Sequence, residues 1–406
     1  MSLTELVNSV TTELNVTEVG AGRLITTLVK HIGKQDFTKS SFIKVGLSDK
    51  DIKFMINELQ VRGYVDMEIS YECRGGRYTS NDFPVTCENC GVMIKDSDHE
   101  HEYDFVYSFT NEFINEVQGY NKQKVFEYLH PDYVVNYYEL KSKISTVVPF
   151  LGAGVSAPFG LPTWTGMLES FEGNVTRANL NYYRRLVSAG NVFEALTFLT
   201  SSSTSLTTEA SIQKAIASKF ANPNLNIPDE EHFMNELVNL DSPIYLTSNY
   251  DNILPNFFKG QRVNPILLNE VEDVRSLIDS AVNRVVHIHG YIDRPSTMIV
   301  TKKQYDELYT NEGYKAKLNA ILAQRHLLFI GWSFADEYFS DLYSKLVSYV
   351  GGEHYMFIEN PVMHQAQKFG QQNLKLIGLN IPVDDSGYSD KKVLVQAIKT
   401  VLDSMV

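Results

Sequence analysis

The sequence predicts an α/β protein: a doubly wound parallel sheet with a helical insertion, which follows a smaller N-terminal α+β domain. From residue 146 onward, short apolar runs alternate with amphipathic segments, the pattern of strands buried on both faces and of the helices between them. Residues 173–221 show helical patterns without strands and therefore predict the insertion. The length of 406 residues, at roughly 150 residues per domain, predicts two or three domains.

The first 63 residues contain three helical patterns, and the third is predicted to begin at Ser48 as an N-cap. Alternating segments over 64–71 and 77–85 then flank a turn at Arg74-Gly75-Gly76. Three helices followed by a hairpin resemble a winged helix-turn-helix, and we assign residues 1–103 to a winged-helix-like domain. The aromatic-rich residues 104–144 are expected to form a helical linker.

The charge distribution disfavours direct binding of nucleic acid. The chain carries 36 basic and 49 acidic residues, a net charge of −13, whereas a phosphate backbone requires a basic footprint. Residues 66–140 alone hold 5 basic and 15 acidic side chains. A protein-interaction role for the N-terminal domain is therefore favoured over DNA binding.

The cysteine count, the N-terminal residues and the longest uncharged stretch predict a cytoplasmic protein that does not span a membrane. Three cysteines are too few for a disulfide framework and suit a reducing compartment. The N-terminal residues show no signal-peptide pattern. The longest uncharged stretch, Ile144–Leu168, contains three prolines and cannot form a continuous helix in lipid.

The catalytic domain is assigned to residues 145–406, with the helical insertion at about 173–240. Its predicted strands are the apolar runs Thr146–Leu151, Ile244–Thr247, Val285–Ile288, Leu327–Ile330 and Tyr355–Ile358. The motifs with chemical potential lie at the ends of these runs, where a doubly wound sheet binds its ligands.

The first strand runs into Gly152-Ala153-Gly154 and then Ser156, a pattern that lets a backbone approach a pyrophosphate. A tight strand-to-helix turn is the alternative, and Pro158 replaces the third glycine of a full dinucleotide fingerprint. A second stretch, Pro162-Thr163-Trp164, follows shortly afterwards.

The run Ile244–Thr247 leads into three polar residues, Ser248, Asn249 and Asp251. Such side chains pack poorly behind a buried strand and are suited to orienting a small polar ligand. Each of them could instead only cap the following helix.

Two histidines, His287 and His289, alternate with apolar residues and would share one face of their strand. A histidine at a strand end is a candidate general base near neutral pH, although a lone histidine is more often a satisfied core residue. We prefer His289, because it ends the strand beside Gly290.

The two last predicted strands end in similar polar residues. Gly331 and Ser333 repeat the order of strand, glycine and hydroxyl, and Ser333 could also cap a helix. Glu359, after the final run, is placed to accept hydrogen bonds from ribose hydroxyls.

Taken in order, these motifs over about 146–383 resemble the sirtuin superfamily. The resemblance implies a Rossmann-like domain that binds NAD⁺ with its nicotinamide buried. It implies a pyrophosphate and ribose site at Gly152, Ala153, Gly154 and Ser156. Gly331 and Ser333 would contact the adenosine half.

The resemblance also assigns the nicotinamide end. Pro162, Thr163 and Trp164 stand where the family has a proline-acid-aromatic stretch near nicotinamide. Asn249 would orient the nicotinamide ribose and a water, and Asp251 would face the carboxamide. His289 would be the general base.

Two departures argue against deacylation of acyl-lysine. Residues 291–330 contain no cysteine, so the four-cysteine zinc ribbon of the protein deacylases is missing there, and Thr163 replaces the family's acid. The chain looks more like the sirtuin-like effectors of bacterial anti-phage systems, which destroy NAD⁺ with an asparagine and a histidine. We therefore expect an NAD⁺ glycohydrolase that acts in abortive infection.

Two other functions stay open. One is ADP-ribosyl or acyl transfer in the same pocket, and the other is a non-catalytic nucleotide-sensing regulator. An enzyme that empties the NAD⁺ pool must be held off until triggered, so we expect a homo-oligomer. We also expect a separate regulatory partner, such as a translocase-type ATPase or a phage-sensing protein, because no P-loop motif is present.

Cys87-Glu-Asn-Cys90-Gly91 has the spacing and trailing glycine of a zinc knuckle. Cys73 lies upstream, and His99 and His101 lie downstream. We assign a structural zinc to Cys73, Cys87, Cys90 and His99, with three reduced thiols as the alternative.

Overall fold

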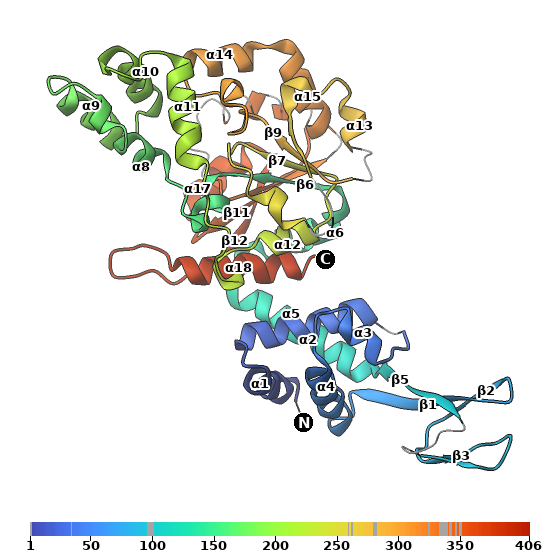
Figure 1. Cartoon of the computed structure of the whole chain (residues 1–406). Helices are drawn as coiled ribbons and strands as arrows, with labels where there is room; N and C mark the ends of the chain where they lie inside the picture. The colour runs from blue at the N-terminus through green and yellow to red at the C-terminus, as the bar shows by residue number, and fades with distance from the viewer. Residues whose placement is uncertain are drawn as a thin grey trace. The chain divides into compact units, whose positions relative to one another are not determined.

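The computed structural model divides the chain into two compact units, residues 1–124 and 125–406 (Figure 1). It describes residues 2–33, 35–95, 101–258, 260, 263–278, 282–323, 325–332, 340, 343–345, 347–348 and 351–406. Among these, no helix is long and apolar enough to cross a membrane.

Helices form most of the first unit: α1 (Leu3–Leu14), α2 (Glu18–Ile32), α3 (Lys39–Ile43), α4 (Asp49–Val61) and α5 (Asn111–Tyr128). Ser48 caps α4 as predicted, because its Oγ accepts a hydrogen bond from the Asp51 backbone N–H at 3.3 Å. The apolar faces of these helices bury one core, which includes Leu6, Ile25 and Phe42.

Two small antiparallel sheets follow the helices. The larger has the order β2-β1-β5, with β1 at Val65–Cys73, β2 at Gly76–Ser80 and β5 at Glu102–Phe109. The smaller pairs β3 (Val85–Thr86) with β4 (Met93–Ile94). The predicted hairpin is therefore present, and a third strand joins it.

The expected linker at 104–144 needs correction, because its first six residues belong to β5. This strand pairs with β1 from Val65↔Phe109 to Glu72↔Glu102. Its aromatic residues alternate at 103, 105, 107 and 109, which is the period of a strand and not of a helix. The helix α5 then continues past the boundary between the units.

The second unit contains a seven-stranded sheet in which every pair is parallel. Its order is β12-β11-β10-β6-β7-β9-β8. The strands are β6 (Val147–Leu151), β7 (Ile244–Thr247), β8 (Pro265–Leu267), β9 (Arg284–His287), β10 (His326–Ile330), β11 (His354–Glu359) and β12 (Leu374–Leu379). With helices on both faces, this is the predicted Rossmann-like α/β fold.

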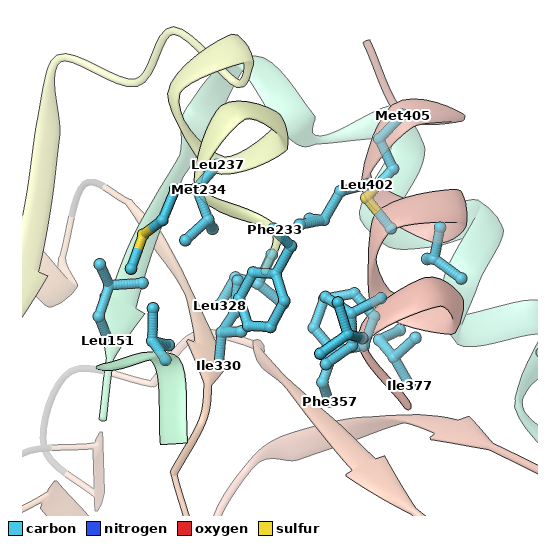
Figure 2. Packing of buried hydrophobic residues seen from close by; sticks show 14 of the residues in the cluster. Leu151, Phe233, Met234, Leu237, Leu328, Ile330, Phe357, Ile377, Leu402 and Met405 are labelled. Carbon is cyan, nitrogen blue, oxygen red and sulfur yellow. The ribbon is translucent and has the colours of Figure 1, made fainter. Parts of the chain in front are cut away.

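Helices cover both faces of this sheet. One face packs against α6 (Val134–Ser142), α12 (Met234–Asn239) and α18 (Lys391–Asp403). In Figure 2, Leu237 of α12 and Leu402 of α18 meet strand residues such as Leu328. The other face packs against α13 (Val274–Ile278), α15 (Glu312–Leu322) and α17 (Met363–Gly370).

The insertion forms a separate helical layer beside the sheet (Figure 1). It contains α8 (Trp164–Glu169), α9 (Leu180–Ser188), α10 (Val192–Ser202) and α11 (Glu209–Phe220). Its core also takes in Tyr250 and Met298, which come from the segments that follow β7 and β9. The insertion therefore packs against the segments that carry the predicted catalytic residues.

A buried histidine joins two strands of the sheet and gives stability a pH dependence. His354 is fully buried, and its Nδ1 accepts a hydrogen bond from the Leu327 N–H at 3.0 Å. Burial, with a smaller contribution from His326, lowers the pKa of His354 to about 4, below an unfolded value near 6.5.

We expect the free energy of unfolding to fall as the pH drops from about 6.5 to about 4. In this range His354 binds a proton in the unfolded chain but stays neutral in the folded chain. At pH 4.5 this histidine should account for roughly 2–3 kcal/mol of the loss. Urea unfolding of wild type and His354→Gln at pH 7.5 and 4.5 measures it. Equal pH-dependent losses in both proteins would contradict the assignment.

Candidate active site

The site lies where the order of strands reverses. β6 has β7 as its neighbour on one side and β10 as its neighbour on the other, although β10 comes later in the chain than β7. Ligands of open parallel sheets bind at the carboxyl ends of strands at such a point. Gly152 directly follows β6, and Gly331 directly follows β10.

The two glycine loops pack backbone against backbone. Gly152 N–H donates to Ile330 O and Gly154 N–H donates to Gly331 O, both at 2.9 Å. A Cβ on Gly152 would lie 2.3 Å from Gly331 O, so no larger residue fits there. In this structure these two amides therefore serve the contact between the loops, while Ala153 and Gly154 remain exposed.

Asn249 comes two residues after β7 and is directed toward the β6 loop. Its Nδ2 donates to Gly152 O at 2.9 Å and to Ser156 Oγ at 3.1 Å. In the described part of the chain, the carboxamide Oδ1 has no hydrogen-bond partner. The amide nitrogen thus anchors the side chain, and the oxygen can accept from a hydroxyl or a water.

Asp251 lies beside the same group and is only 7% exposed. Burial raises the pKa of this carboxyl, while hydrogen bonds from Ser156 and from the Ile253 N–H act against it. Ser156, Asn249 and Asp251 border one cavity of about 10 Å³, about the room that one water molecule needs. The apolar lining comes from Leu151, Val155, Met234, Leu254, Pro255 and Val285.

His287 supports the backbone beside Asn249. Its Nδ1–H donates to Asn249 O at 2.8 Å, and its Nε2 is buried without a partner among the described residues. Burial lowers the pKa of His287 to about 4, despite backbone carbonyls that favour the charged form. The ring is therefore neutral at pH 7, and its hydrogen bond to Asn249 O helps to position the backbone of this asparagine.

His289 lies two residues beyond His287. Asn249 likewise lies two residues beyond Thr247, which pairs with His287 where β7 and β9 run side by side. The Tyr309 hydroxyl forms a hydrogen bond with its Nε2, and the Tyr305 hydroxyl is 3.3 Å from its Nδ1. The imidazole is 2% exposed. Asn249 and His289 thus end neighbouring strands at one edge of the sheet, each held by different partners.

Sequence reasoning missed both tyrosines. They lie four residues apart on α14 (Lys302–Thr310), so they share one face of that helix. Phe193, from α10 of the insertion, packs edge-on against Tyr305 with ring centroids 4.7 Å apart. The i,i+4 spacing was the available signal, but nothing in it pointed to a histidine.

The stretch at 162–164 begins α8. Thr163 Oγ1 accepts a hydrogen bond from the Gly166 N–H at 3.1 Å and so caps this helix, with Pro162 just before it. The Trp164 ring meets Tyr250 edge-on at 5.9 Å, which places it next to the residue that follows Asn249.

Two further predicted contacts lie along the same edge. The Ser248 N–H donates to Leu151 O at 3.2 Å. Glu359 ends β11, and its Oε2 is buried without a partner in the described segments, so it can accept from hydroxyl groups. Ser333 lies outside the described residues.

A comparison with family models finds a likeness for this part of the chain. A model of the SIR2-like domain matches residues 243–377, the stretch that carries Asn249, His289 and Gly331. Residues 243–377 therefore resemble a SIR2-like domain. The glycine loop at 152–156 and the insertion lie before the matched residues.

A curated relative extends the likeness. The chain is 25% identical to "NAD(+) hydrolase ThsA" of Cytobacillus dafuensis over 265 residues, which are 63% of this chain and 51% of that protein. The matched region thus spans about half the length of the curated relative.

Three of the four predicted metal ligands lie in one cluster in the first unit. Cys73, Cys87 and Cys90 come together with His101 as a group that could hold a metal ion. His99, which we assigned as the fourth ligand, lies outside the described residues.

Proposed function

We propose that this chain is an NAD⁺ glycohydrolase, which cleaves the nicotinamide–ribose bond to give nicotinamide and ADP-ribose. The observation that carries the proposal is the convergence of Ser156, Asn249 and Asp251 on one cavity at the switch point of the sheet. These residues follow two strand ends about 90 residues apart. The resemblance to the sirtuin superfamily assigns Ser156 to the pyrophosphate and ribose and assigns Asn249 and Asp251 to the nicotinamide end, and the SIR2-like match includes the last two residues. The similarity to an NAD(+) hydrolase points the same way.

The reaction demands few groups. The pyridinium of NAD⁺ is already cationic, so nicotinamide leaves as a neutral molecule and needs no acid. A water molecule forms the new bond to C1′ of the ribose and must lose a proton. In our proposal Asn249 Oδ1 holds that water or the ribose hydroxyl, and His289 accepts the proton.

Substrate binding requires the site to open. The cavity of about 10 Å³ has room for a water molecule but not for a nicotinamide ring. Leu254 and Pro255, in the short 3-10 turn at Leu254–Phe257, form one wall of it. Movement of this turn away from Ser156 would admit the ring.

The direct test is incubation of the purified chain with NAD⁺, followed by chromatographic separation of the products. Free ADP-ribose and nicotinamide in equal amounts support hydrolysis, and cyclic ADP-ribose would instead indicate cyclisation. A modified acceptor protein would favour ADP-ribosyl transfer, which is the second candidate. Binding of NAD⁺ without turnover, with and without neighbouring gene products, would favour a nucleotide sensor.

We further propose that the enzyme acts in anti-phage defence by depleting NAD⁺, under the control of a separate partner protein or of self-association. The first unit, with a net charge of −7 over 66–124 (5 basic and 12 acidic side chains), is the proposed docking part. The proposal rests on the need to restrain such an activity. Loss of NAD⁺ in infected cells that carry the active gene, but not the Asn249→Ala variant, is the expected observation.

Tyr305 is expected to position the proposed base. Tyr305→Phe removes the hydroxyl 3.3 Å from His289 Nδ1 and keeps the ring, so kcat should fall about five- to tenfold with little change in KM. Steady-state kinetics across pH 6–9 measure the effect. Loss of the Tyr305 hydroxyl beside the His289 imidazole should also shift the pH profile of kcat. Tyr182→Phe, on the exposed face of α9, is the matched control and should behave as wild type. An unchanged kcat and pH profile for Tyr305→Phe would contradict this role.

A further inference from the structure

Four metal-ligating side chains meet in the first unit, whereas the proposed NAD⁺ site belongs to the second. The sulfur atoms of Cys73, Cys87 and Cys90 and a ring nitrogen of His101 all lie within 4.8 Å of one another. Cys90 Sγ is 3.3 Å from His101 Nε2. A tetrahedral zinc with Zn–S bonds of about 2.3 Å would separate its ligand atoms by roughly 3.5–3.8 Å, so small shifts suffice.

The four ligands come from separate segments that the backbone holds in place. Cys73 ends β1, and His101 directly precedes β5, the antiparallel partner of β1. Cys87 and Cys90 lie in one tight turn after β3, closed by the Gly91 N–H donating to Cys87 O at 2.9 Å. The site therefore ties three backbone segments to one point.

The surroundings of the cluster favour a bound metal over three reduced thiols. Cys73, Cys87 and His101 are 7%, 1% and 6% exposed, and all three cysteines are free of disulfides. Without a cation, burial of these converging polar side chains would cost free energy of desolvation and provide few interactions to offset it. Three thiolates and one imidazole match the soft ligands and tetrahedral geometry of zinc.

We propose that Cys73, Cys87, Cys90 and His101 bind one structural zinc ion, and that this ion holds the β3–β4 hairpin against β1 and β5. Among the described residues, the buried core beneath the hairpin consists of Ile69, Tyr71, Cys73, Cys87 and Ile94. A cluster of this size supports little structure without a cross-link or a metal. With all four positions taken by protein, the ion has no open site for catalysis.

The test uses the full chain purified without chelator. Metal analysis by mass spectrometry should find about one zinc per chain in wild type and less than about a tenth in Cys90→Ser and in His101→Ala. The matched control is His99→Ala, which removes the neighbouring histidine and should keep its zinc. Zinc retained by His101→Ala but lost from His99→Ala would overturn the ligand assignment.

A second measurement keeps the proposal testable if the variants do not fold. Wild-type protein stripped of metal and reloaded with cobalt should show the thiolate-to-cobalt absorption of a tetrahedral site. Limited proteolysis should cut the stripped protein within 73–101 several times faster than the zinc-loaded protein. Wild type that binds neither zinc nor cobalt, with equal proteolysis of both forms, would show three reduced thiols and refute the site. NAD⁺ loss is measured in parallel, so that failure of the metal site and failure of the proposed enzyme are distinguished.

Discussion

Purified Asn249→Ala and His289→Ala are each expected to lose NAD⁺ turnover by about 10²–10⁴-fold while keeping the wild-type fold. Asn249→Ala removes the carboxamide that Gly152 O and Ser156 Oγ hold in place, so the water or ribose loses its orienting group. His289→Ala removes the group proposed to accept the water proton. Chromatography of the remaining NAD⁺ measures turnover, and circular dichroism checks the fold.

His326→Ala is the matched control. His326 is the first residue of β10, so it lies at the amino-terminal ends of the strands, opposite the proposed site. It should retain turnover. His289→Ala that consumed NAD⁺ at the wild-type rate would overturn the proposed base. His287→Ala is expected to lower turnover through the lost hydrogen bond to Asn249 O, so only the result for His289→Ala tests the base.

Replacement of Lys399 is expected to lower the free energy of unfolding by about 3–5 kcal/mol. This lysine is fully buried, and its Nζ lies 2.9 Å from Asp229 Oδ2 and 3.2 Å from Glu236 Oε1. It also donates to His232 O at 2.8 Å. Lys399→Met would leave the 3% exposed Glu236 without its cation inside the core. Urea unfolding at pH 7.5 measures the change.

Adding Glu236→Gln should return part of the lost stability, because the buried carboxylate is then neutralised. Lys50→Met is the matched surface control. It breaks the exposed pair with Glu13 and should change stability very little. If Lys399→Met unfolded at the same urea concentration as wild type, the buried network would not contribute to stability.

Five of the seven parallel strands could be predicted because they are central and apolar on both faces. The two that were missed, β8 and β12, lie at the edges of the sheet. β8 has only three residues and begins with Pro265, and β12 is interrupted by Lys375 and Gly378. An edge strand can expose one side to solvent, so its sequence lacks the continuous apolar run.

The candidate site could be predicted as far as single motifs allow. Polar residues after buried strands identified Ser156, Asn249 and Asp251, which border one cavity in the structure. The partners that hold these residues could not be predicted, since they depend on tertiary packing. Tyr305 reaches His289 from a helix whose sequence looks merely amphipathic.

The position of β6 in the sheet also determines when the proposed activity can arise during synthesis. β6 pairs Phe150 with Leu246 on one side and Val147 with His326 on the other, so its neighbours emerge from the ribosome about 100 and 180 residues after it. The switch point between β7 and β10 therefore forms only after these later strands are made, and contacts so distant in sequence form slowly. A nascent or prematurely terminated chain ending before β10 would lack the switch point, so a cell that makes the proposed NAD⁺ hydrolase would be spared its activity until β10 has been synthesised.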